Sequence, residues 1–109
     1  MKLLVSVVTL GLFTVGLPLL AAGDVQAGKA VYDSKCKICH GAEGEGNPAI
    51  AKTLKVEFKP LGSKAIQAKT DAEFKKQISE GGGKMQPLKG LSDKQIQDVI
   101  AFIRSLAKS

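Results

Sequence analysis

Residues 36–40 read Cys36-Lys37-Ile38-Cys39-His40. Two cysteines separated by two residues and followed directly by histidine form the C-x-x-C-H pattern of c-type haem attachment. At this spacing each thiol can add to one vinyl group of a haem, and the imidazole of the next residue then lies against the iron. The pattern predicts one covalent haem c, held by Cys36 and Cys39, with His40 as an axial ligand of its iron.

Three other interpretations of the cysteine pair remain open from the sequence. A disulfide between Cys36 and Cys39 would close a very short loop and stabilise the fold little. A thioredoxin-like redox pair needs a βαβ pattern around it, and none is visible. A structural zinc site needs four ligands, whereas His40 is the only histidine of the chain.

Because there is no second histidine, the other axial ligand must be of a different type. Apart from Met1, the chain contains one methionine, Met85, in the stretch GGGKMQP at residues 81–87. Haem iron accepts methionine opposite histidine, and glycines let a backbone approach a flat ligand closely. The sequence therefore predicts Met85 as the second axial ligand. The alternative is that Met85 only fills the core, as most methionines do.

The N-terminal stretch has the pattern of an export signal. Lys2 is followed by an uncharged apolar run from Leu3 to Ala22, which is typical of a secretory signal peptide. We expect residues 1–22 to be removed and residues 23–109 to form one monohaem domain in the periplasm, without stable insertion in a membrane. Cleavage after Ala27 and an uncleaved membrane anchor are the alternatives.

Composition narrows the classes of partner. The chain has 16 Lys and Arg against 10 Asp and Glu, a formal net charge of +6, and an excess of lysine favours acidic partners. Nucleic acid is not expected as a partner, because Arg104 is the single arginine and no aromatic residues are interleaved with the lysines. Four aromatic residues beyond the signal make a thin core, which a buried porphyrin would complete.

Helical signals dominate the rest of the chain. Asp24 can cap a helix that runs to about Lys37, and the glycine-rich residues 41–48 form a loop. Residues 54–59 alternate like a strand but have no partner run, so we expect an extended loop with its apolar side chains inward. A short helical stretch is expected over residues 63–69.

Two further helices carry capping boxes. Thr70 with Glu73 starts one that ends at Gly81, and Ser92 with Gln95 starts the C-terminal helix. The apolar spacing of the latter continues to the end of the chain. The predicted fold class is all-α.

With these motifs in this order, the chain resembles the class I c-type cytochromes, of the small monohaem bacterial kind. The resemblance is carried by Gly28, Tyr32, residues 36–40, the Met85 loop and the terminal segment DVIAFIRSL. It implies three to five helices wrapped around one covalent haem. The first and last helices would cross with Gly28 and Tyr32 against Phe102, and a backbone carbonyl at Pro48 would accept the imidazole N–H.

An iron held by His40 and Met85 has no free position for a substrate, so we expect a single-electron carrier and not an enzyme. Four lysines would border the exposed haem edge and offer a docking face to an acidic oxidase, reductase or dehydrogenase; they are Lys35, Lys37, Lys84 and Lys89. The alternative is that they are ordinary solvated lysines. We expect a monomer, with two alternatives for function: a haem subunit of a larger dehydrogenase or oxidase complex, or an open-site haem that binds small ligands.

Overall fold

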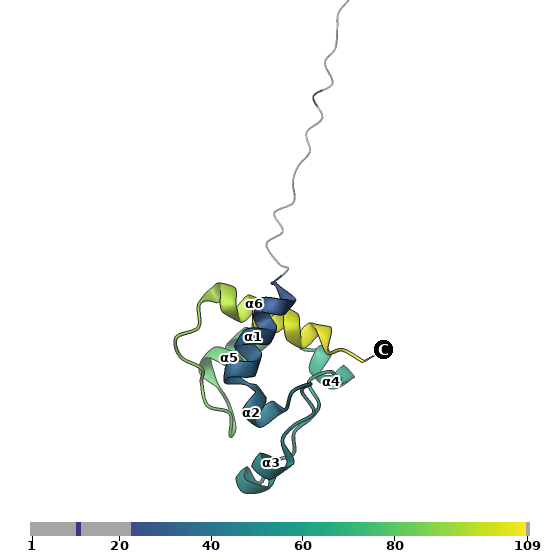
Figure 1. Ribbon diagram of the computed structural model, residues 1–109, viewed down its shortest axis with the longest axis vertical. Helices are drawn as coiled ribbons and strands as arrows, with labels where there is room; N and C mark the ends of the chain where they lie inside the picture. The colour runs from purple at the N-terminus through teal and green to yellow at the C-terminus, as the bar shows by residue number, and fades with distance from the viewer. Residues whose placement is uncertain (1–10, 12–22, 109) are drawn as a thin grey trace, which may run out of the picture.

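A computed structural model describes Gly11 and residues 23–108 of the chain. Within that part the chain is mostly helical and contains no strand, only an isolated bridge between Gly82 and Met85. The helices are α1 (Val25–Lys35), α2 (Lys37–His40), α3 (Pro48–Leu54), α4 (Lys64–Gln67), α5 (Asp71–Glu80) and α6 (Asp93–Ser105). Figure 1 shows α1, α5 and α6 gathered in one half of the domain, while α2 and α3 lie in the other half.

The all-α prediction is confirmed, with more helices than the three to five expected because α2 and α4 are single turns of four residues each. Apart from Gly11, residues 1–22 lie outside the described part, and so does the predicted signal. Among the described helices, none has the length and apolarity needed to cross a bilayer.

Helix α1 begins where the sequence predicts and ends two residues earlier. The Asp24 side chain accepts hydrogen bonds from the backbone N–H groups of Gln26 and Ala27, as an N-cap does. The helix ends at Lys35, and Cys36 then separates it from α2. The first cysteine of the motif therefore lies at the junction of two helices.

The first and last helices cross at a glycine. A Cβ atom at Gly28 would lie only 1.8 Å from the carbonyl oxygen of Asp98, so the two backbones touch there. One turn along α1, the Tyr32 ring packs on Phe102 with 4.8 Å between ring centroids. The crossing and the Tyr32–Phe102 contact expected from the resemblance are confirmed, whereas Gly28 meets the backbone of Asp98 and not Phe102. The motif begins one turn of α1 after Tyr32.

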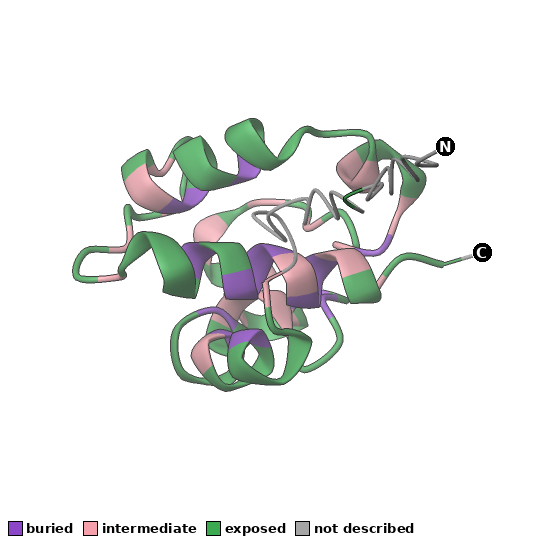
Figure 2. Cartoon of the chain, turned by 90° about the horizontal axis from the view of Figure 1, so that it is seen from above, coloured by how far each residue is buried: buried purple, intermediate pink, exposed green. Residues whose placement is uncertain are grey.

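The main core lies between α5 and α6. Both helices begin with complete capping boxes, at Thr70 and at Ser92. Their inward faces are buried (Figure 2), and the core cluster comprises Phe74, Ile78, Ile96, Val99, Ile100 and Ile103. Because α5 and α6 are fixed in this way, the loop between them that carries Met85 is held at both ends.

One segment differs from the sequence-based expectation, and two agree with it. Residues 48–54 form helix α3, which the sequence analysis did not predict; Asn47 caps it by accepting from the N–H groups of Ala49 and Ile50. Residues 56–60 are irregular, as expected for an extended loop, and the side chains of Val56 and Phe58 are half-buried. The short helical stretch expected over residues 63–69 is α4.

Candidate haem site

The Cys36–His40 motif forms one helical turn. The carbonyl oxygen of Cys36 accepts hydrogen bonds from the N–H groups of Cys39, at 3.2 Å, and of His40, at 2.9 Å. Cys36 is 8% exposed and Cys39 is half-buried, and both are free thiols. Burial, and secondly the neighbouring Cys39, raise the pKa of the Cys36 thiol to about 11. The turn thus brings both sulfur atoms and the imidazole together, as the sequence predicts.

The other interpretations of the cysteine pair find little support. The thiols form no disulfide with each other, and the described part has no strand for a βαβ unit. Among residues 23–108, no group of three or more His, Cys, Asp or Glu side chains is arranged to hold a metal ion. A zinc site of four side-chain ligands is therefore not formed by the described residues.

The His40 imidazole is held in a buried setting. Burial lowers its pKa, so the ring is neutral near pH 7 and has a lone pair available for iron. Its Nδ1 atom is buried and has no hydrogen-bond partner among the described residues. The Phe58 ring packs against the imidazole in an edge-to-face arrangement with 5.5 Å between centroids. A Cβ at Gly46 would meet the Cβ of Phe58 at 2.6 Å, so glycine at 46 is needed for this packing.

The expected hydrogen bond from His40 to the Pro48 carbonyl is not made. Pro48 is the first residue of α3, and carbonyls in an α-helix point along its axis toward the residue four positions ahead. The sequence analysis could not anticipate this because it placed Pro48 in a loop.

The glycine-rich loop is tied back onto the motif by two side chains. Asn47 donates from Nδ2 to the Ile38 carbonyl at 3.0 Å, and its N–H donates to the Cys39 carbonyl at 2.9 Å. The Tyr32 hydroxyl donates to the Gly41 carbonyl at 2.5 Å. Sequence reasoning missed the role of Asn47, although Asn followed by Pro is a recognisable start of a helix.

Tyr32→Phe tests this tie directly. Burial raises the pKa of Tyr32 well above its usual range, so the hydroxyl stays protonated and donates. Removing it leaves the Gly41 carbonyl with only the longer bond from the Gly44 N–H, at 3.3 Å, while the ring contact with Phe102 is kept. We expect the free energy of unfolding to fall by about 0.5–1.5 kcal/mol, measured by urea denaturation of the haem-loaded protein. An unchanged midpoint would contradict this role for Tyr32.

Met85 lies on the separate loop between α5 and α6. It is half-buried, and the loop turns tightly because Gly82 and Met85 exchange two backbone hydrogen bonds, of 3.0 and 2.9 Å. A Cβ at Gly81, which has φ +71°, would lie 2.5 Å from the Met85 carbonyl oxygen, so this turn requires glycine. The N–H of Leu88 donates to the Ile78 carbonyl and pins the far side of the loop.

The Met85 sulfur already has a polar partner. The Nε2 atom of Gln77, on α5, donates to the Met85 Sδ at 3.4 Å. Among the described residues no hydrogen bond links Met85 to the Cys36–His40 turn. Sequence reasoning missed Gln77, whose position on α5 carries no signal of this contact.

The four predicted residues supply two free thiols, a neutral imidazole with an unpaired buried nitrogen, and a thioether on a glycine-rich loop. This donor set fits a c-type haem with its iron. A groove between α5 and α6, lined by Ala72, Lys75, Ile96 and Ile100 among others, contains none of the four. The groove is therefore separate from the four predicted residues.

Residues 25–107 match the family model described as Cytochrome c. The chain belongs to the cytochrome c family. Cytochrome c6 of Synechocystis sp. is 35% identical over 101 residues, covering 90% of this chain and 78% of the relative. Cytochrome c-554(547) of Halothiobacillus neapolitanus is 31% identical over 93 residues, covering 78% and 99%. The solved structure of the KustC0563 c-type cytochrome has a TM-score of 0.65 and 26% identity, covering 74% of this chain and 98% of its own.

These findings confirm the predicted resemblance and the all-α cytochrome c fold. This chain is a small class I c-type cytochrome. Membership of the cytochrome c family implies a covalently bound haem c with its iron, and electron transfer as the function.

Proposed function

We propose that the chain is an exported, periplasmic, monohaem electron carrier, with the haem joined to Cys36 and Cys39 and its iron ligated by His40 and Met85. The observation that carries the proposal is the helical turn at residues 36–40, where two free thiols lie beside a half-buried, neutral imidazole whose Nδ1 atom is buried. One such turn supports one haem. In this proposal residues 1–22 are the signal and residues 23–109 the monohaem domain.

When bound, the haem supplies the one-electron couple between Fe(III) and Fe(II). The chain's own residues hold and shield it. His40 and Met85 would hold the iron from its two sides, which would leave no position for a substrate and favours an electron carrier over an enzyme. Tyr32 and Phe58 pack around the Cys36–His40 turn and keep its imidazole in place.

An absorption spectrum of the exported protein tests the attachment. We expect a pyridine haemochrome characteristic of two thioether bonds, at one haem per chain, and a weak far-red band of the oxidised protein from iron–sulfur bonding. The haem should stay with the protein in acid acetone. Colourless protein, or haem that extracts, would refute the attachment at Cys36 and Cys39.

The open-site hypothesis has one observation in its favour. Three consecutive glycines, residues 81–83, precede Lys84 and Met85, and glycines give the loop a backbone that can adopt other conformations. Carbon monoxide distinguishes the two states, because it binds reduced iron only where an axial position is free. We expect the reduced protein at pH 7 not to bind it; tight binding would favour the open site. A subunit of a larger complex would instead co-purify with other chains, whereas we expect a monomer.

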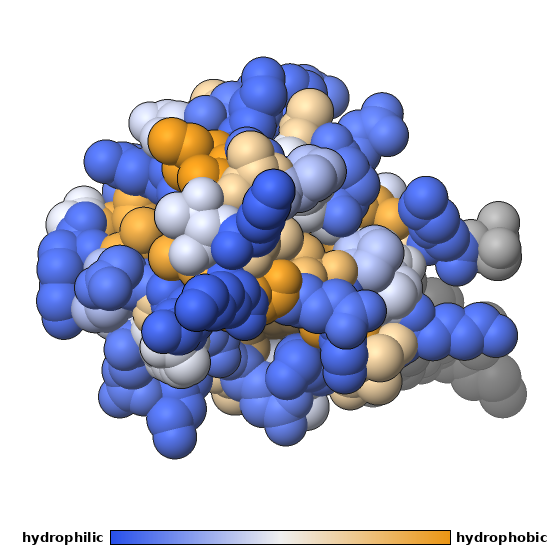
Figure 3. Space-filling view, turned by 90° about the horizontal axis from the view of Figure 1, so that it is seen from below, coloured by the Kyte–Doolittle hydropathy of each residue, from blue (hydrophilic) through white to orange (hydrophobic). Residues whose placement is uncertain are grey.

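A docking face for an acidic redox partner is supported by four exposed lysines, Lys35, Lys37, Lys84 and Lys89. None of them takes part in an ion pair within residues 23–108, so their charges are available to a partner. Ile38, inside the motif, is 70% exposed. Apolar patches open among hydrophilic residues on the face seen from the α3 side (Figure 3). Such a face suits an oxidase, reductase or dehydrogenase with an acidic surface.

Ionic strength should therefore control the reaction with an acidic partner. Raising salt from 10 mM to 150 mM shortens the Debye length from about 30 to about 8 Å, so we expect the second-order rate constant with an acidic partner to fall at least about tenfold. Stopped-flow mixing measures it. The double variant Lys35→Gln, Lys84→Gln should lose part of this dependence, while Lys76→Gln on α5 serves as the control. A second-order rate constant that does not change with salt concentration would contradict the docking proposal.

Gln77 is expected to adjust the reduction potential. A thioether sulfur has two lone pairs, so it can bind iron with one and accept from Gln77 Nε2 with the other. This hydrogen bond withdraws electron density from sulfur and favours Fe(II). Gln77→Leu should lower the potential by up to about 40 mV, the equivalent of one hydrogen bond of about 1 kcal/mol. Redox titration measures it, with Lys76→Leu as control; an unchanged potential would exclude the effect.

A further inference from the structure

The crossing of α1 and α6 contains a buried carboxylate. The Asp98 side chain is 7% exposed, and its Oδ1 accepts from the Asp24 N–H at 2.8 Å and from Lys94 Nζ. Both partners, and the Lys94 bond first, hold the pKa of Asp98 below its usual range, so it is ionised at neutral pH. Within residues 23–108, no hydrogen bond is made to its other oxygen, which leaves an acceptor free.

The backbone of Gly23 lies directly on α6 beside that carboxylate. A Cβ at Gly23 would be 2.2 Å from the Gln97 carbonyl oxygen and 2.8 Å from the Asp98 Cα. The Asp24 nitrogen is 2.8 Å from Asp98 Oδ1, and consecutive backbone nitrogens are at most about 3.6 Å apart. The Gly23 nitrogen is therefore at most about 6.4 Å from Asp98 Oδ1, close to the range in which opposite charges interact.

We propose that hydrolysis of the Ala22–Gly23 bond leaves an α-ammonium group on Gly23 that pairs with the Asp98 carboxylate, so that removal of the signal itself strengthens the α1–α6 crossing. The inference rests on the export signal proposed above. A signal-processing protease supplies the chemistry: water adds across the peptide bond, Ala22 keeps a carboxylate, and Gly23 keeps an amine. An α-amino group has a pKa of about 7.7–8.0, so this amine is protonated at neutral pH.

The structure favours cleavage after Ala22 over cleavage after Ala27. The shorter product would lack Asp24, which caps α1 through two N–H groups and donates to Asp98. It would also lack the first turn of α1. Losing such a cap destabilises a helix.

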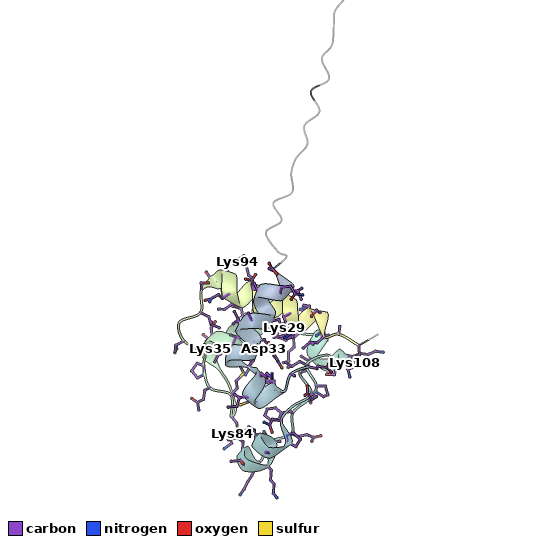
Figure 4. The ribbon with its side chains drawn as sticks, in the orientation of Figure 1. Lys29, Asp33, Lys35, Lys84, Lys94 and Lys108 are labelled. Atoms are coloured by element: carbon purple, nitrogen blue, oxygen red, sulfur yellow. The ribbon has the colours of Figure 1, made fainter. Side chains whose placement is uncertain are left out.

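The charges around the new ammonium are mixed. It would stand near the N-terminus of α1, whose dipole disfavours a cation, and the carboxylates of Asp24 and Asp98 offset that. Lys94 competes for Asp98, and Lys29 on α1 is already paired with Asp33. Lys94 lies at the end of the domain opposite Lys84 and the Met85 loop (Figure 4), so changes here should leave the haem spectrum unaltered.

The first test is the intact mass of the haem-loaded protein purified after export. We expect a chain that begins at Gly23. A chain that begins at Gly28 would overturn the processing site, and one that keeps residues 1–22 would overturn the export proposal as well.

The second test is a double-mutant cycle on the exported protein. One alanine inserted between Ala22 and Gly23 turns the ammonium into a neutral peptide N–H, with the new N-terminus checked by mass. We expect the insertion to lower the urea midpoint by about 0.2–0.5 M, and to have little effect in Asp98→Asn. In the control Lys94→Met the insertion should keep its effect. Equal effects with Asp98 and with Asn at this position would overturn the ion pair while leaving the processing site intact.

A pH series covers the case in which Asp98→Asn does not fold. Pairing raises the pKa of the Gly23 amine above its unfolded value, so the added stability is complete below about pH 7.7 and is lost as pH rises through the folded value. Reduced protein that begins at Gly23 should lose stability over this range, and the inserted form should not. Parallel pH profiles would overturn the pairing.

Discussion

Met85→Ala is expected to abolish the weak far-red band and to lower the reduction potential by about 0.1 V or more, within the about 0.8 V range that axial ligands span. The thioether favours Fe(II) over Fe(III), so its loss favours the oxidised state. The haem should remain attached, because Cys36 and Cys39 lie on a different segment, at the junction of α1 with α2 and within α2. The reduced variant should also bind carbon monoxide at the vacated position.

Lys84→Ala provides the matched control, since it changes the neighbouring exposed residue of the same loop and should leave band and potential nearly unchanged. Redox titration and the spectrum of the oxidised protein measure both variants. If Met85→Ala kept the far-red band, methionine would not be the ligand, and His40 would need a different partner opposite it.

Gly28→Ala is expected to destabilise the fold by about 3 kcal/mol or more. Overpacking usually costs about 1–3 kcal/mol, but the obstacle here is the Asp98 backbone at 1.8 Å from the added Cβ, which cannot turn away as a side chain can. Helices α1 and α6 would have to separate, and the Tyr32 contact with Phe102 would loosen with them. On propensity alone the same change would favour a helix by about 1 kcal/mol, so the two effects have opposite signs.

Ser34→Ala is a suitable control for that experiment. Ser34 is exposed on the same helix, so its substitution tests helix propensity without the crossing and should be neutral or slightly stabilising. Urea denaturation of both haem-loaded variants and of the parent protein gives the midpoints to compare. Equal midpoints for Gly28→Ala and the parent would show that the helices can move apart at little cost.

Short sequence motifs were sufficient to predict where the helices that carry them begin. The capping boxes at Thr70 and Ser92 give the starts of α5 and α6, because a box is formed by residues three positions apart. The crossing of α1 and α6 at Gly28, in contrast, was anticipated from the family resemblance. The haem motif is local in the same sense as a capping box, since its cysteines and histidine fall within a single turn.

The sequence could not predict contacts between segments that lie far apart in the chain. The Gln77 bond to Met85 depends on how the loop folds back over α5. Helix α1 ends at Lys35, with Cys36 as its C-cap. No glycine or proline stands there to mark the end of the helix in the sequence. Helix α3 was missed because the glycine-rich pattern before it hid the Asn47 cap, and with it the position of the Pro48 carbonyl.

The hydrogen bond between Asp24 and Asp98 joins residues 74 positions apart, and this separation affects how the protein can mature. In the export proposed above, helix α1 would emerge early from a translocation channel, whereas the surface it packs on is formed by residues 93–105, which would emerge last. An exported chain cannot close the domain until its whole length has crossed, because pairing across so long a loop has to wait for both ends. Until then Cys36 and Cys39 stay open to the assembly machinery that would attach the haem.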